Sequence, residues 1–138
     1  MKPITIRELD HIVLNVSEID RALDFYANVL GLKIERLDEF RAGKIGFPSA
    51  RINEHTIIDL FPSKDKAESC ESGKKAPANL NHFCLVVEKE DFSGIVDYLK
   101  GHGVAILNGP ISRWGARGRA MSVYFHDPDD NEIEIRCY

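Results

Sequence analysis

A ten-residue stretch that occurs twice in the chain places the strongest constraint on its fold. Residues 9–18 read Leu-Asp-His-Ile-Val-Leu-Asn-Val-Ser-Glu, and residues 80–89, which begin 71 positions later, read Leu-Asn-His-Phe-Cys-Leu-Val-Val-Glu-Lys. In both copies a histidine opens a short apolar run dense in β-branched residues, which is typical of a buried strand followed by a polar helix start. We therefore expect one structural unit used twice, with both imidazoles aimed at a common place.

The segments after each copy predict the same order of elements. In the first half we expect an amphipathic helix that begins near Ser17 and ends at Gly31, then strands at residues 32–37, 44–47 and 55–61. In the second half we expect a strand, a helix and three further strands, at residues 81–87, 91–102, 104–108, 120–126 and 132–137. Both halves read βαβββ, so the predicted fold class is α+β.

A polar stretch separates the two halves. Residues 63–78 contain little that could be buried, which predicts a connection between a module at about 7–62 and another at about 79–138. The chain has 138 residues, close to the common size of one domain. We therefore expect a single domain over 1–138, made of two modules that share one core.

Composition narrows the classes of partner. With 43% hydrophobic and 29% charged residues and a net charge of -4, the chain gives no reason to expect nucleic acid or a membrane as partner. The short, charged N-terminus does not resemble a signal peptide, so we expect a cytoplasmic protein. Three cysteines, Cys70, Cys84 and Cys137, form no metal-binding spacing, and we expect Cys84 to be a small buried side chain.

Each half also carries an acid at a matching position. Asp59 in Ile58-Asp59-Leu60 aligns with Glu134 in Ile133-Glu134-Ile135, and the intervals from His11 to Asp59 and from His82 to Glu134 are 48 and 52 residues. Imidazoles and carboxylates are suited to a divalent first-row metal such as Fe, Ni, Co, Mn or Zn. We predict a metal site of His11, His82 and Glu134.

Asp59 has several candidate roles. It is a candidate fourth ligand, or it could act through water, orient a ligand or contact substrate. Either Asp59 or Glu134 could serve as a proton-transferring base. The structural alternative is that the histidines only begin strands and that Glu134 faces solvent, as polar residues on a one-sided sheet do.

Positive charge gathers in one glycine-punctuated segment. Arg113, Trp114 and Arg117, with Arg119 beside them, are candidate contacts to a small anionic substrate, because guanidinium groups bind carboxylate and phosphate and the indole offers a flat apolar surface. The alternative is a solvated loop with a structural arginine.

Several of these motifs together resemble the vicinal oxygen chelate superfamily, which includes glyoxalase I, fosfomycin-modifying transferases, extradiol dioxygenases and metal-free bleomycin-binding proteins. The resemblance covers about residues 7–138 and lies in the duplicated βαβββ order, in Leu9-Asp10-His11, Phe25-Tyr26, Leu30-Gly31-Leu32 and Asn81-His82-Phe83, and in Asp127-Pro128-Asp129-Asp130-Asn131 before Ile133-Glu134-Ile135. Residues 109–118 resemble a subgroup of small glyoxalase-domain proteins, some called virulence-associated or dioxygenase-related.

The resemblance implies a partly open barrel around one metal, and it implies a homodimer. By position, His11, His82 and Glu134 fall on the family's recurring ligands, while glyoxalase I has a glutamate where this chain has Asp59. The leading hypothesis is a metal-dependent, glyoxalase-like lyase or isomerase that chelates a small anionic oxygenated substrate. The alternatives are an Fe(II) extradiol dioxygenase and a non-catalytic small-molecule binding or resistance protein.

Overall fold

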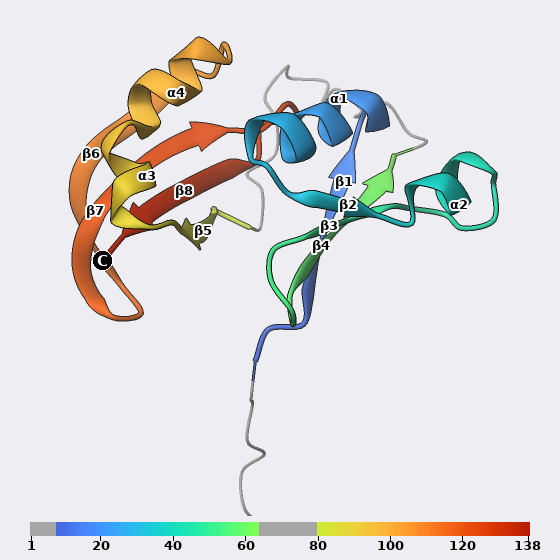
Figure 1. Ribbon diagram of the computed structural model, residues 1–138, viewed down its shortest axis with the longest axis horizontal. Helices are drawn as coiled ribbons and strands as arrows, with labels where there is room; N and C mark the ends of the chain where they lie inside the picture. The colour runs from blue at the N-terminus through green and yellow to red at the C-terminus, as the bar shows by residue number, and fades with distance from the viewer. Residues whose placement is uncertain (1–7, 64–79) are drawn as a thin grey trace, which may run out of the picture. The chain divides into compact units, whose positions relative to one another are not determined.

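The computed structural model describes residues 8–63 and 80–138, which form two compact units, Met1–Ala67 and Glu68–Tyr138 (Figure 1). Apart from Ser63, the predicted connection at 63–78 lies outside the described residues, and so does Cys70. Each unit is described by itself, and the assignment of the whole chain to one domain stays a prediction.

The first unit is a four-stranded sheet with helices between its strands. In chain order its elements are β1 (His11–Val16), α1 (Ile19–Asp24), the π-helix η1 (Phe25–Val29), β2 (Lys33–Glu35), α2 (Leu37–Arg41), β3 (Ser49–Arg51) and β4 (Ile57–Pro62). The strand order is β1-β4-β3-β2, with β1 and β4 parallel and the other pairs antiparallel. The first and last strands of the unit are therefore neighbours in its sheet.

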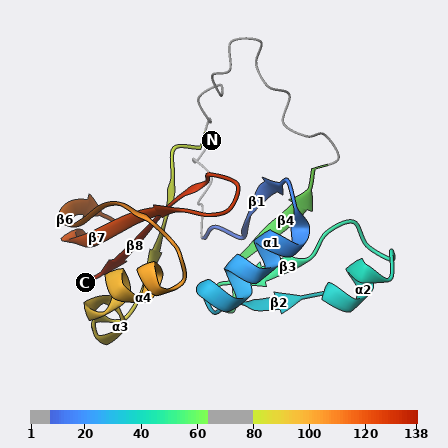
Figure 2. The same ribbon diagram turned by 90° about the horizontal axis from the view of Figure 1, so that it is seen from above.

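Side-chain alternation gives this sheet one buried apolar face and a second face that carries its polar side chains beside Val13 and Phe61. Leu14 and Val16 of β1 and Ile58 and Leu60 of β4 are buried, and α1 lies against β4 (Figure 2). Because successive side chains of a strand point to opposite faces, His11 and Asp59 belong to the other face. Burial of the apolar face thus places His11 and Asp59 together on the opposite face of the sheet.

The second unit repeats this plan. Its elements are β5 (Phe83–Val86), α3 (Lys89–Ser93), α4 (Ile95–Gly101), β6 (Ile106–Gly115), β7 (Gly118–His126) and β8 (Glu132–Cys137), with the strand order β5-β8-β7-β6. The pair β5 and β8 is parallel, as β1 and β4 are. Val123, Phe125, Ile133 and Ile135 are buried, and α3 contacts β8 while α4 contacts β6.

The α+β class and the duplicated βαβββ order are confirmed, and so is the predicted alignment of the two acids. Asp59 pairs with Val13, two residues after His11, and Glu134 pairs with Cys84, two residues after His82. The two sheets therefore carry histidine and acid in the same register.

Three local predictions were wrong. The strand expected at 44–47 lies at Ser49–Arg51, since Pro48 has no N–H for a ladder and the strand begins only after it. The strand expected at 32–37 ends at Glu35, because Arg36 takes a left-handed conformation with φ 61° and α2 begins at Leu37. The helix expected at 91–102 is interrupted at Gly94, which separates α3 from α4.

Two predictions in the second unit also need correction. The glycine-punctuated segment with Arg113 and Trp114 is not a loop, because it belongs to the ten-residue strand β6, which pairs with β7 up to Gly115 and Gly118. Cys84 is exposed instead of buried, because it takes the polar-face position of β5 opposite Glu134.

Candidate functional site

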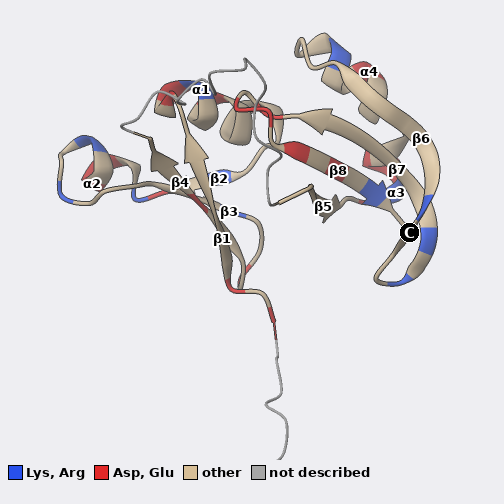
Figure 3. Ribbon diagram, turned by 180° about the vertical axis from the view of Figure 1, so that it is seen from behind, with Lys and Arg blue, Asp and Glu red and all other residues tan. Residues whose placement is uncertain are grey.

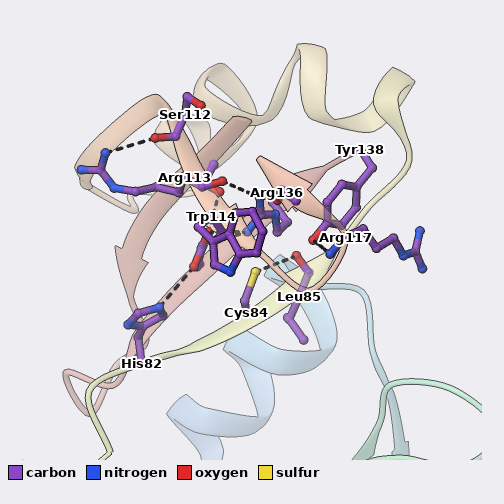
Figure 4. Close-up of polar contacts among 12 residues, drawn as sticks. His82, Cys84, Leu85, Ser112, Arg113, Trp114, Arg117, Arg136 and Tyr138 are labelled. Carbon is purple, nitrogen blue, oxygen red and sulfur yellow. Dashed lines mark hydrogen bonds and ion pairs between the residues drawn. The ribbon is translucent and has the colours of Figure 1, made fainter. Parts of the chain in front are cut away.

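A histidine and a glutamate of the second unit meet on its polar face. Nε2 of His82 lies 3.2 Å from Oε2 of Glu134, and Figure 4 marks this contact at His82. Nδ1 of His82 lies 2.6 Å from Oδ1 of Asn81. Because an amide oxygen only accepts hydrogen bonds, Nδ1 carries the ring hydrogen, and a neutral imidazole then presents a lone pair on Nε2.

The other oxygen of Glu134 is already occupied. Ser122 Oγ donates a hydrogen bond to Oε1 at 2.5 Å, and Nη1 of Arg136 lies 3.6 Å from the same oxygen. The Glu134 side chain is only 5% exposed. A serine and an arginine therefore hold Oε1 and leave Oε2 directed at His82.

Tyr124 lies beside both His82 and Glu134. It lies opposite Glu134 in the ladder between β7 and β8, and its ring meets the imidazole of His82 edge-on, with centroids 5.6 Å apart. Desolvation, reinforced by the Glu134 carboxylate, raises the pKa of Tyr124. The phenol therefore remains a hydrogen-bond donor beside the site.

The geometry of His82 and Glu134 fits a shared cation. Two donors each about 2.1 Å from one ion, at angles of about 90–109°, lie roughly 3.0–3.4 Å apart. Nε2 and Oε2, at 3.2 Å, have this separation, and they contact each other while the second polar atom of each side chain is bound elsewhere. Within residues 8–63 and 80–138, however, no group of three or more His, Cys, Asp or Glu residues comes together to hold a metal ion.

The first unit carries the equivalent pair in a related setting. Nδ1 of His11 lies 2.6 Å from Oδ2 of Asp10, and this hydrogen bond, with help from the charge of Asp59, raises the pKa of His11. Ser49 Oγ donates to Oδ1 of buried Asp59 at 2.6 Å, and Nη2 of Arg36 donates to that Oγ at 3.1 Å. Each acid is thus held by one serine with an arginine beside it.

Of the three predicted substrate residues, only Arg113 shares the face of Glu134. Arg113 pairs with Ala120, which alternates with Ser122 and Tyr124 on that face, and its charge acts on Tyr124. Trp114 takes the alternate strand position and is 76% exposed. Arg117 lies in the turn between β6 and β7, where Figure 3 shows basic residues.

The sequence reasoning missed the residues that orient the candidate ligands. Asp10 and Asn81 could have been found, because both repeats place a side chain with an oxygen acceptor directly before the histidine. Ser49 and Ser122 carried no such signal, since their partners are set by strand register. Cys84, exposed as a residue, is also on this face, where partial desolvation of its sulfur and the nearby Glu134 carboxylate raise the pKa of the thiol to about 12.

No helix among the described residues has the length and apolar character needed to cross a membrane.

Known proteins resemble the chain over almost all of its length. Virulence protein STM3117 of Salmonella typhimurium is 32% identical, over 96% of this chain and 85% of its own. The glyoxalase domain-containing protein RDO1 of Mycosarcoma maydis is 30% identical, over 99% of this chain and 72% of its own. The crystal structure of a glyoxalase/dioxygenase from Nostoc punctiforme matches with a TM-score of 0.77 and 26% identity, covering 99% of this chain and 97% of that one.

More distant similarities reach proteins whose names state an activity or a bound metal. A lactoylglutathione lyase of Neisseria meningitidis is 26% identical, over 91% of this chain and 86% of its own. A variant of the fosfomycin resistance protein FosX from Listeria monocytogenes, in complex with Mn(II) and a dihydroxypropylphosphonic acid, matches with a TM-score of 0.69. Its identity is 19%, with coverage of 96% and 93%, so it shows a shared fold alone.

The family model that matches this chain covers residues 8–135, which include both histidines and both acids. The chain belongs to the glyoxalase/bleomycin resistance protein/dioxygenase superfamily.

Proposed function

We propose that this protein is a metal-dependent, glyoxalase-like enzyme of the lyase or isomerase type that binds a small anionic oxygenated substrate. One observation carries the proposal: Nε2 of His82 and Oε2 of Glu134 face each other at 3.2 Å. A neutral imidazole and a carboxylate both present lone pairs there, and positive charge between them, either a proton carried by the imidazole or a bound cation, makes the contact favourable. In the proposed function a divalent cation supplies that charge.

His82 and Glu134 would hold the cation, with His11 as a third ligand and Asp59 as a candidate fourth. The hydrogen bonds from Nδ1 of each histidine to Asn81 and Asp10 support this assignment, since metal-binding histidines usually donate their other ring N–H to an oxygen acceptor. A bound cation would act as a Lewis acid toward substrate oxygens. The lactoylglutathione lyase among the similar proteins supports a reaction of the lyase type.

The surrounding side chains suit an anionic substrate. Arg113 places a guanidinium on the same face as Glu134, where it can bind a carboxylate or phosphate group. Tyr124 keeps its proton and can donate a hydrogen bond to a substrate oxygen. Asp59, fixed through one oxygen by Ser49, keeps the other oxygen available to take a proton.

Metal binding tests the proposal directly. The full chain, purified without chelator, would be examined by elemental analysis and then titrated by calorimetry with Mn(II), Co(II), Ni(II) and Zn(II), and with Fe(II) under anaerobic conditions. We expect one site per chain. His82→Ala and Glu134→Gln should abolish it, and Asn81→Ala should weaken it by about 10- to 100-fold, because the imidazole loses its orienting partner.

His126→Ala is the matched control, because His126 is an exposed histidine of the same unit. Unchanged affinity in His82→Ala would refute the proposal, and absence of any bound metal would favour a non-catalytic binding protein. Fe(II) with oxygen uptake would favour the extradiol dioxygenase. The homodimer and the cytoplasmic location stay predictions, and size-exclusion chromatography checks the first.

A further inference from the structure

Arg136 has an unusual set of partners for a residue two positions after a candidate metal ligand. Its side chain is 3% exposed, and one nitrogen, Nη1, contacts both Oε1 of Glu134 at 3.6 Å and the carbonyl oxygen of Trp114 at 3.0 Å. Nη2 donates to the carbonyl oxygens of Arg113 at 2.8 Å and Gly118 at 3.3 Å. A single guanidinium thus binds the Glu134 carboxylate and three backbone carbonyls of the hairpin formed by β6 and β7.

The hairpin leaves space for this guanidinium at Gly115. A Cβ atom at Gly115 would lie 1.9 Å from Nη1 of Arg136 and 2.7 Å from the hydroxyl oxygen of Tyr138, so only glycine leaves the space. Tyr138 adds a second layer: its ring covers Arg136 with 4.8 Å from centroid to Cζ, and its hydroxyl accepts a hydrogen bond from the backbone N–H of Arg117 at 3.0 Å. Figure 4 shows Arg136 and Tyr138 beside the hairpin residues.

These contacts join two parts of the candidate site. The hairpin carries Arg113, Trp114 and Arg117, and Glu134 faces His82. Ser122 of β7 also binds Glu134, but Arg136 is the residue that connects Glu134 to the end of the hairpin near Arg113, Trp114 and Gly118. Because one planar guanidinium makes all of these contacts, a change in its contact with Glu134 can be passed to the carbonyls that it holds.

We infer that Arg136 is a positioning residue that couples Glu134 to the β6–β7 hairpin, so that replacement of the Glu134 carboxylate alters the conformation of the substrate-binding segment. The inference deepens the proposed function, because it takes the hairpin as the element that meets the substrate. The contact pattern itself does not require a metal. The coupling can therefore be measured in protein that has been treated with a chelator.

Trp114 supplies the readout. It is the only tryptophan of the chain, so the full-length 15N-labelled protein gives one indole N–H signal by NMR, beside the backbone amides of the hairpin. In chelator-treated protein we expect Glu134→Gln to shift the indole signal and the amides of the hairpin. In a Gly115→Ala background, where the new methyl group displaces the guanidinium, the same change should lose most of this effect.

Gly101→Ala is the matched control, since a Cβ there meets no atom within 4 Å, and it should leave the response to Glu134→Gln intact. Gly115→Ala crowds the guanidinium of Arg136 and the hydroxyl of Tyr138, and because both are the outer ends of side chains and not backbone, we expect the variant to fold. Arg136→Met offers a second route, since it keeps the length of the stem and removes the charge. Hairpin signals that do not move in Glu134→Gln, or that move equally in the Gly115→Ala background, would overturn the coupling.

A cation titration separates this inference from the proposed function. If a divalent cation shifts the signals of His82 and its neighbours but not those of the hairpin, the metal site is supported and the coupling is refuted. If no cation binds and the hairpin still responds to Glu134→Gln through Gly115, the metal-dependent function fails and the coupling stands.

Discussion

Replacement of Ser122 by alanine tests whether the buried carboxylate is held as the structure shows. Ser122 is fully buried, and its hydroxyl is the short donor to Oε1 of Glu134. A hydrogen bond to a charged group contributes about 1.5–3 kcal/mol, and Arg136 at 3.6 Å replaces only part of it. We expect Ser122→Ala to lower the free energy of unfolding by about 2 kcal/mol, which corresponds to a fall in Tm of roughly 4–8 °C for a chain of this size.

The assay is urea unfolding followed by circular dichroism, with Ser112→Ala as control. Ser112 is an exposed serine of the neighbouring strand β6, and loss of its hydroxyl should change stability by less than about 0.5 kcal/mol. A Ser122→Ala variant as stable as Ser112→Ala would refute the reasoning, because it would mean that Oε1 of Glu134 does not depend on this donor.

Two further predictions concern the ionisation of side chains near the sheets. The thiol of Cys84, with its pKa raised from 9.0 to about 12, should have a thiolate fraction near pH 8 about a thousandfold below that of an ordinary cysteine. Its alkylation by iodoacetamide, followed by peptide mass spectrometry, should therefore be slow and should accelerate in Glu134→Gln, and fast alkylation in the parent protein would contradict the structure. The hydrogen bonds from Arg51 lower the pKa of Glu35, so its contribution to stability is present above its ordinary value near 4.5 and is lost as pH falls through the folded-state pKa. Glu35→Gln should lower the stability of the protein to urea at pH 7 but not at a pH below the folded-state pKa of Glu35. An equal loss of stability at these two pH values would rule out the ion pair as the cause.

The parts of the fold that were predictable are those with a repeated, alternating pattern. In β8, Ile133 and Ile135 alternate with Glu134 and Arg136, so both the strand and its polar face could be expected. The duplication also gave the alignment of Asp59 with Glu134, because both acids occupy matching positions after the repeated histidines.

Short or glycine-rich elements were not predictable in the same way. The strand β3 and the helix α2 have three and five residues, too few for a period to show. Glycines at the end of β6 suggested a loop, yet Gly115 serves close packing against Arg136 inside a strand. Likewise, the partners of the two acids depend on which residues of adjacent strands stand opposite one another, which no pattern along one strand reveals.

The pairing register of the strands explains why the two acids of the site differ in length. Ser49 stands directly opposite Asp59, whereas Ser122 stands two residues away from the position opposite Glu134, so the longer acid reaches a diagonal partner and still extends its second oxygen to His82. Glu134→Asp should therefore keep the charge but break one of the two contacts, weakening cation binding by at least about tenfold in calorimetry, as loss of an orienting partner does. Asp59→Glu is the reciprocal variant. Because Asp59 already binds Ser49 directly opposite it, a longer side chain there should not improve cation binding. Undiminished cation affinity in Glu134→Asp would mean that the extra methylene of Glu134 is not needed for it to contact both Ser122 and His82.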